Sequence, residues 1–155
     1  MGLHRFYIDT SVFGGCLESI FSEDSNRLVD AAKAKRAIFV LSDKVFDEIH
    51  QAPQNVLDVL SSIPNDSIET LVETLAVAEL RDAYLNAKIL GPKSKIDAMH
   101  VAYATIARVD AIVSWNFKHI VRFDKMKAFN QVNLQNGYGI IQIVSPKEVI
   151  FDEQD

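Results

Sequence analysis

Residues 5–9 read Arg-Phe-Tyr-Ile-Asp, and Thr10 and Ser11 follow directly. This short apolar run predicts a buried strand that ends at Asp9. A second apolar run, Ala-Ile-Phe-Val-Leu, occupies residues 37–41. Strands that are apolar on both faces are typical of a parallel sheet with helices on each side. These two strands are therefore expected to belong to the buried sheet at the centre of the fold.

Helical segments alternate with the predicted strands along the rest of the chain. Apolar spacing and capping residues predict helices over 23–36, 43–51, 53–64, 74–90 and 94–108, with a basic, partly helical stretch to residue 135. Further strands are predicted over 68–72, 111–115 and 138–144. Gly14-Gly15 is expected to break the chain. The alternation predicts an α/β fold, with three α/β/α layers and a mostly parallel central sheet.

Length and composition narrow the class of protein. The 155 residues fit one domain, which we expect over residues 1–150, with an acidic, solvated tail over 151–155. The single cysteine, Cys16, cannot form an intramolecular disulfide, so we expect a reducing compartment and a cytoplasmic protein. The four histidines are scattered without the spacing of a zinc site. Because no apolar run approaches the roughly twenty residues of a membrane-spanning helix, we do not expect this chain to be a membrane protein.

Charge is unevenly distributed along the chain. The net charge is −5, yet residues 91–130 carry seven basic and three acidic side chains. The overall acidity argues against a protein that coats nucleic acid, which would be basic throughout. The basic stretch permits a local basic rim around an acidic site, and an ordinary solvated surface is the alternative.

Polar side chains at the ends of predicted strands and in nearby helices form the candidate site. Asp9 ends the first strand, Glu48 lies in the helix after the second, and Asp97 begins the helix before the fourth. Asn116 follows the fourth strand. Ligands of open α/β sheets bind beyond the carboxyl ends of the strands, and these residues would converge there if the sheet is doubly wound. Either protonation or a cation must relieve the repulsion between such carboxylates, and oxygen ligands favour Mg²⁺ or Mn²⁺ as the cation. Hydrolysis of a phosphodiester is the chemistry expected there.

Several of these residues have structural alternatives. Asp47 is a rival to Glu48 on another face of the same helix, and Asp97 is also placed to form a capping box with Ser94. Thr10 and Ser114 can support the carboxylates by hydrogen bonds or serve as turn residues.

Four segments in order carry a resemblance to a known family. Residues 7–12 (Tyr-Ile-Asp-Thr-Ser-Val), 42–49 (Ser-Asp-Lys-Val-Phe-Asp-Glu-Ile), 97–104 (Asp-Ala-Met-His-Val-Ala-Tyr-Ala) and 111–117 (Ala-Ile-Val-Ser-Trp-Asn-Phe) resemble the motifs of PIN-domain nucleases. The order and spacing agree over roughly residues 5–145. Within that family, the chain looks most like the VapC-like toxins of type II toxin–antitoxin systems.

The resemblance implies a sheet in the order 3-2-1-4-5 and a metal-dependent endoribonuclease that an antitoxin protein holds inactive. Asp9, Glu48 and Asp97 would then be ligands of Mg²⁺ or Mn²⁺, and Asn116 would orient a water molecule or second cation. RNA would be the substrate, and four basic residues would contact the phosphates that flank the scissile one: Lys93, Lys95, Lys118 and Arg122. A homodimer is a further expectation, with Leu71, Leu75, Leu80 and Tyr84 as its face or as ordinary core.

One departure from the family pattern leaves alternatives open. Asn116 stands where the fourth motif usually supplies an Asp, and it offers a carbonyl oxygen without a negative charge. Asp124 could replace that acid only if residues 117–124 fold back. The rival function is therefore a catalytically weak or inactive module with this fold that binds nucleic acid or protein.

Three ring-bearing residues near the motifs also have two interpretations each. Trp115 either stacks a base or packs inside the protein. His100 is a site residue or a core residue. His119 contacts phosphate or lies on the surface.

Overall fold

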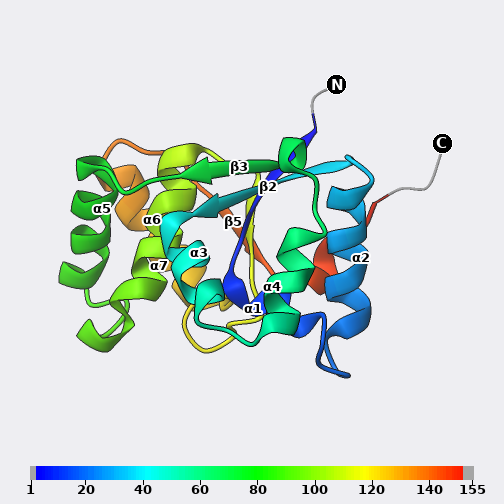
Figure 1. Cartoon of the computed structure of the whole chain (residues 1–155). Coiled ribbons are helices and arrows are strands. Elements are labelled where there is room, and N and C mark those ends of the chain that lie inside the picture. The colour runs from blue at the N-terminus through cyan, green and yellow to red at the C-terminus, as the bar shows by residue number, and fades with distance from the viewer. Residues whose placement is uncertain (1–2, 152–155) are drawn as a thin grey trace.

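The computed structural model describes residues 3–151 and has a five-stranded sheet at its centre. All neighbouring strands run parallel, in the order β3-β2-β1-β4-β5 (Figure 1). The strands are β1 (His4–Ile8), β2 (Ala37–Ser42), β3 (Ile68–Leu71), β4 (Ala111–Val113) and β5 (Gln142–Val144). The predicted α/β fold, its parallel sheet and the strand order are confirmed.

Helices cover both faces of this sheet. Figure 1 shows α2 and α4 on one side and α5, α6 and α7 on the other. The helices are α1 (Thr10–Gly15), α2 (Ser22–Lys33), α3 (Asp43–His50), α4 (Gln54–Ser61), α5 (Leu75–Asn86), α6 (Lys95–Ala107) and α7 (Phe123–Gln135). Short 3₁₀ turns are η1 (Asn65–Ser67), η2 (Pro92–Ser94) and η3 (Pro146–Glu148). No helix of the described residues is both long and apolar enough to cross a membrane.

The pairing of β1 with both neighbours explains why its sequence is apolar. Tyr7 is aligned with Val40 on one side and with Ile112 on the other, and Tyr7 is fully buried. The carboxyl ends of β1, β2 and β4 consequently meet at one edge of the sheet. This edge is where Asp9 and the residues after β4 lie.

The expected break at Gly14-Gly15 is wrong, because both glycines are inside α1. Val12 and Phe13 are fully buried and hold the helix against the core. Gly15 is required there for packing: a Cβ atom on it would lie 2.7 Å from the Trp115 indole nitrogen. Gly15 is therefore needed for a close contact between elements and not for a break in the helix. In the sequence alone, a glycine with either role looks the same.

The last strand is shorter than the predicted 138–144. The side chain of Asn130 forms two hydrogen bonds with the backbone of Ile141. Its Oδ1 atom accepts from the Ile141 N–H at 2.7 Å, and its Nδ2 atom donates to the Ile141 carbonyl at 3.0 Å. These bonds replace strand pairing at Ile141, so β5 begins only at Gln142. The strand predicted over 111–115 also ends early, because the Trp115 N–H donates to Ser11 Oγ at 3.0 Å.

Helix ends also differ from the prediction. Lys35, Lys88 and Arg108 have φ angles of 62°, 60° and 57°. Left-handed residues commonly follow the last turn of a helix, where glycine is the usual signal. In this chain, basic residues and not glycines occupy these positions, so the sequence carries no stop signal there. The helices α2 and α5 therefore end earlier than the predicted residues 36 and 90. Phe151 packs edge-on against Phe6, so it is not a solvated tail residue, and residues 152–155 lie outside the described residues.

Candidate functional site

Asp9 lies at the carboxyl end of β1 and is 7% exposed. Its Oδ2 atom accepts hydrogen bonds from Ser114 Oγ at 2.6 Å and from Ser11 Oγ at 2.9 Å. These two hydroxyl groups, from the segments after β4 and β1, fix the carboxylate. The other oxygen, Oδ1, lies 3.9 Å from His100 Nε2.

Glu48 approaches Asp9 from α3, which Ser42 caps by accepting from the Val45 N–H at 3.3 Å. Glu48 Oε1 accepts from Thr10 Oγ1 at 2.8 Å and lies 3.1 Å from His100 Nε2. Burial raises the pKa of the Glu48 carboxyl, but the hydrogen bonds from His100 and Thr10 and the charge of His100 outweigh it, so the pKa is lowered. The neighbouring Asp47 is exposed and takes no part in this cluster.

His100 completes this group from α6 and is 1% exposed. Its Nδ1 atom lies 2.6 Å from the Tyr7 hydroxyl oxygen, which lies 2.7 Å from Ser42 Oγ. Burial lowers the pKa of His100, yet its bond to Glu48 and the negative charges of Asp9, Glu48 and Asp97 raise it overall. The ligand atoms of Asp9, Glu48 and His100 lie within 4.8 Å of one another. We call these three residues the Asp9 cluster.

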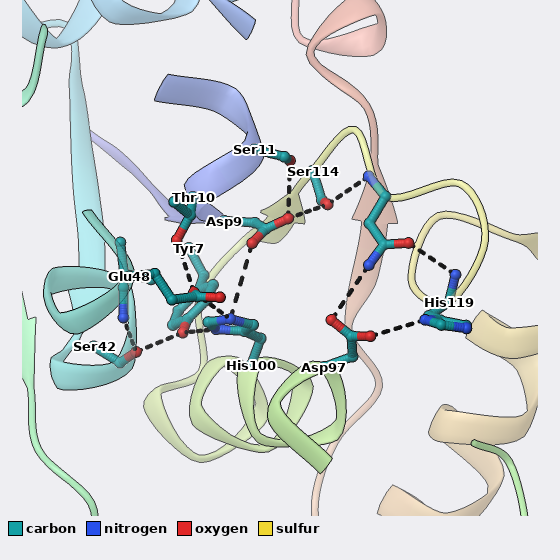
Figure 2. A network of polar contacts seen from close by, with 12 residues as sticks. Tyr7, Asp9, Thr10, Ser11, Ser42, Glu48, Asp97, His100, Ser114 and His119 are labelled. Atoms are coloured by element: carbon teal, nitrogen blue, oxygen red, sulfur yellow. Dashed lines mark hydrogen bonds and ion pairs between the residues drawn. The ribbon is translucent and has the colours of Figure 1, made fainter. Parts of the chain in front are cut away.

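Asp97 lies in the first turn of α6 and forms a second group, the Asp97 cluster, with Asn116 and His119 (Figure 2). Asp97 Oδ1 accepts from Asn116 Nδ2 at 3.3 Å, and Asp97 Oδ2 lies 2.9 Å from His119 Nδ1. Asn116 Oδ1 accepts from the His119 N–H at 2.9 Å. Its amide therefore holds Asp97 and the loop after β4 in one arrangement.

The predicted capping box at the start of α6 is wrong. Ser94 occupies the N-cap position, but its side chain makes no capping hydrogen bond. Both carboxylate oxygens of Asp97 instead contact the loop after β4. The Asp97 side chain thus faces the candidate site.

Ser114 joins the two clusters. Its hydroxyl group donates to Asp9 and accepts from the Asn116 N–H at 2.9 Å. Figure 2 shows Asp9, Glu48 and His100 on one side of this link and Asp97 with His119 on the other. The negative charge of Asp97 also contributes to the raised pKa of His100, so the clusters share one electrostatic environment.

The four predicted phosphate-binding residues are all exposed. Lys93 and Lys95 lie just before Asp97 on the chain, and Lys118 lies between Asn116 and His119. Arg122 makes an ion pair of 2.8 Å with Asp124, which is also exposed. Asp124 therefore engages Arg122 and does not stand in for the fourth acid.

Aromatic residues near the site divide into packed and exposed rings. Trp115 Nε1 donates to Ser25 Oγ at 2.8 Å, and its ring lies 4.3 Å from that of Phe21. Of its two interpretations, internal packing is therefore the one seen. The adjacent Phe117 has 49% of its surface exposed.

The arrangement fits a divalent cation by the chemistry of its donors. Two carboxylates and one imidazole place their ligand atoms within 4.8 Å of one another, and the charge of a third carboxylate, Asp97, acts on the imidazole. Serine and threonine hydroxyls orient the carboxylates, as outer-shell partners do in metal sites. Sequence reasoning placed Asp9, Glu48, Asp97 and Asn116 near this edge, and the structure brings them there.

Both histidines of the site escaped the sequence analysis as ligands. His100 is one helical turn after Asp97, and that spacing was the available signal. His119 lies 22 residues from Asp97 on the chain, and only the fold of the loop after β4 brings them together.

Comparisons with known proteins place the fold but not the activity. One chain of a solved toxin–antitoxin complex from Klebsiella pneumoniae is similar over 94% of this chain and 99% of its own length, with a TM-score of 0.54 and 16% identity. Identity this low shows a likeness of fold alone. Neither the protein-family models nor the curated proteins gave a match.

Proposed function

We propose that this protein is a metal-dependent endoribonuclease of the toxin type. The observation that carries the proposal is the convergence of the Asp9 cluster at the carboxyl edge of the sheet, with ligand atoms within 4.8 Å. Asp97 and Asn116 lie next to it through Ser114. The resemblance of the four motifs to PIN-domain nucleases and the similarity in fold to a chain of a toxin–antitoxin complex support the same function.

Each side chain has a role in the proposed reaction. Asp9, Glu48 and Asp97 would hold Mg²⁺ or Mn²⁺, which when bound polarises a phosphoryl oxygen and lowers the pKa of a water ligand. Asn116 would position that water through its amide group. Lys93, Lys95, Lys118 and Arg122 would hold the flanking phosphates, contacts that do not depend on base sequence.

Cleavage of a mixed single-stranded RNA pool tests the proposal. The protein is incubated with Mn²⁺, with Mg²⁺ or with EDTA, and DNA of matched sequence serves as the substrate control. We expect cleavage of RNA with a divalent cation and none in EDTA. Asp9→Asn and Asp97→Asn should each reduce the rate on the order of 100-fold. Asp58→Asn, which changes an exposed acid on α4, is the matched control and should retain the rate.

The same assay separates the nuclease from the rival function. If the folded protein cleaves no RNA with either Mn²⁺ or Mg²⁺, the result would support a binding module and refute the nuclease. Asn116→Asp then restores the acid that the motif usually supplies. A gain of cleavage in that variant would identify Asn116 as the cause of inactivity.

Partnership with an antitoxin protein follows from the toxin-type function and belongs to the same proposal. Expression of this chain alone in a bacterial cytoplasm should arrest growth, and Asp9→Asn should relieve the arrest.

A homodimer is also proposed, with the exposed Val72 and Leu75 at its face. Leu80 and Tyr84 are buried in the core and do not contribute to such a face. Light scattering of the purified protein measures the oligomeric state.

A further inference from the structure

An imidazole group lies among carboxylates where the sequence predicted oxygen ligands alone. His100 Nε2 lies 3.1 Å from Glu48 Oε1 and 3.9 Å from Asp9 Oδ1. His100 is 1% exposed, so its ring is held by the protein and not by solvent. The nitrogen that faces the carboxylates is placed as a third donor to a shared cation.

The opposite nitrogen of His100 has a buried partner. Nδ1 lies 2.6 Å from the Tyr7 hydroxyl oxygen, and this oxygen lies 2.7 Å from Ser42 Oγ. The Tyr7 hydroxyl can therefore accept a hydrogen bond from the Nδ1–H group of His100 while it donates a hydrogen bond to Ser42 Oγ. Metal-binding histidines have this pattern: one nitrogen binds the metal while the N–H of the other donates to a nearby group that fixes the ring.

The carboxylate of Asp9 is oriented consistently with this role. Ser11 and Ser114 both donate to Oδ2, which leaves Oδ1 directed at His100 Nε2. Thr10 donates to Glu48 Oε1, the same oxygen that lies next to His100 Nε2. The Asp97 carboxylate, in contrast, contacts Asn116 and His119 with its two oxygens.

We propose that His100 Nε2 is a direct ligand of the metal ion together with Asp9 and Glu48, so that the site prefers Mn²⁺ to Mg²⁺. The inference rests on the proposed metal-dependent function and changes the ligand set that the motifs imply. Mg²⁺ takes oxygen ligands and keeps much of its water, whereas first-row transition ions accept imidazole more readily. Tyr7 is then a positioning residue, because it acts on the metal only through His100.

Pulsed electron paramagnetic resonance of bound Mn²⁺ tests the ligand directly and needs no substitution. In the unsubstituted protein we expect ¹⁴N modulation from a coordinated imidazole. Labelling of histidine with ¹⁵N should replace the ¹⁴N pattern by a ¹⁵N pattern. Bound Mn²⁺ without nitrogen coupling would overturn the inference. Modulation that disappears in His119→Gln and persists in His100→Gln would also overturn it, because His119 would be the ligand.

Calorimetric titration tests the preference between metals. Mn²⁺ should bind more tightly than Mg²⁺, and His100→Gln should weaken Mn²⁺ binding by at least about tenfold while Mg²⁺ binding changes little. Tyr7→Phe should weaken Mn²⁺ binding in the same direction, by about 10–100-fold. Equal affinities for the two ions in the unsubstituted protein would contradict the inference.

These results are independent of RNA cleavage. Nitrogen coupling without cleavage in any metal would leave the ligand assignment standing and refute the nuclease. Cleavage with Mg²⁺ and Mn²⁺ alike, without nitrogen coupling, would leave the nuclease standing and refute the role of His100.

Discussion

The hydroxyl group of Ser114 is fully buried and serves both halves of the candidate site. It donates to Asp9 and accepts from the Asn116 backbone. Ser114→Ala removes a hydrogen bond to a carboxylate and leaves the partly buried N–H of Asn116 without its partner. We expect a loss of about 1.5–3 kcal/mol in the free energy of unfolding. Mn²⁺ affinity should also fall, by about 10–100-fold. Urea denaturation and calorimetry measure the two effects.

Ser67 provides the matched control for this substitution. It is 1% exposed, and its hydroxyl has no hydrogen-bond partner among the residues that the structure describes. Ser67→Ala removes an unsatisfied polar group, so stability should be unchanged or increased. Equal losses in the two variants would mean that the hydroxyl of Ser114 is not held by the contacts described above.

Cys16 gives a prediction with a defined pH dependence. Burial raises the pKa of its thiol to about 11, an effect only partly offset by the charge of Lys33. Because the thiolate is the nucleophile, the folded protein should react slowly with iodoacetamide at pH 8, and faster as the pH rises towards the thiol pKa. Unfolding in urea should accelerate alkylation on the order of 100-fold, as the pKa returns to about 8.5. Mass spectrometry follows the reaction, and equal rates in both states would contradict the prediction.

At the scale of elements, α1 depends on one of its two glycines. A Cβ atom on Gly15 would lie 2.7 Å from Ser25 Oγ and 2.7 Å from the Trp115 indole nitrogen, whereas a Cβ atom on Gly14 would have no neighbour within 4 Å. Gly15→Ala must displace the hydrogen bond between these two side chains. We expect destabilisation of about 1–3 kcal/mol.

Gly14→Ala is the control within the same helix. With open space around it, the methyl group should stabilise α1 by about 0.5–1 kcal/mol. Thermal unfolding of both variants should therefore give shifts of opposite sign. Shifts of the same sign would show that helix propensity, and not the approach of Trp115, decides the effect.

The prediction of elements from sequence succeeded where periodicity determines them. The apolar runs at 5–9 and 37–41 gave two strands because both of their faces are covered. The prediction failed where a side chain from another element forms the hydrogen bonds that strand pairing would otherwise form, as Asn130 does with the backbone of Ile141. These bonds join residues that lie 11 positions apart, Asn130 in α7 and Ile141 just before β5, so the apolar pattern of the strand itself does not contain them.

The candidate site shows the same division. Asp9 was predictable from its position after a strand, since the parallel topology brings strand ends to one edge. The contact of His100 with Glu48 depends on how α6 and α3 face each other, 52 residues apart on the chain. Sequence alone therefore predicted the carboxylates as ligands and left His100 open as either a site residue or a core residue.

At the scale of the whole molecule, the net charge of −5 opposes binding of a polyanion. The proposed binding of RNA at an acidic site would then depend on the exposed lysines around it. Lys93 and Lys95 flank the start of α6, close to Asp97. Lys35 precedes β2 and so lies at the opposite, amino-terminal edge of the sheet, where it pairs with Asp66 at 3.0 Å.

This placement predicts that substitution of Lys93 and Lys95 changes the salt dependence of RNA binding and that substitution of Lys35 does not. RNA binding is measured by fluorescence anisotropy at several salt concentrations, in the Asp9→Asn background to prevent cleavage. Each phosphate contact on a single strand contributes about 0.7 to the slope of log affinity against log salt. Loss of both contacts in Lys93→Ala/Lys95→Ala should reduce the magnitude of the slope by about 1.4, whereas Lys35→Ala should leave it unchanged. If Lys35→Ala had the larger effect, RNA would bind at the other edge of the sheet, away from the carboxylates, and the proposed substrate path would be wrong.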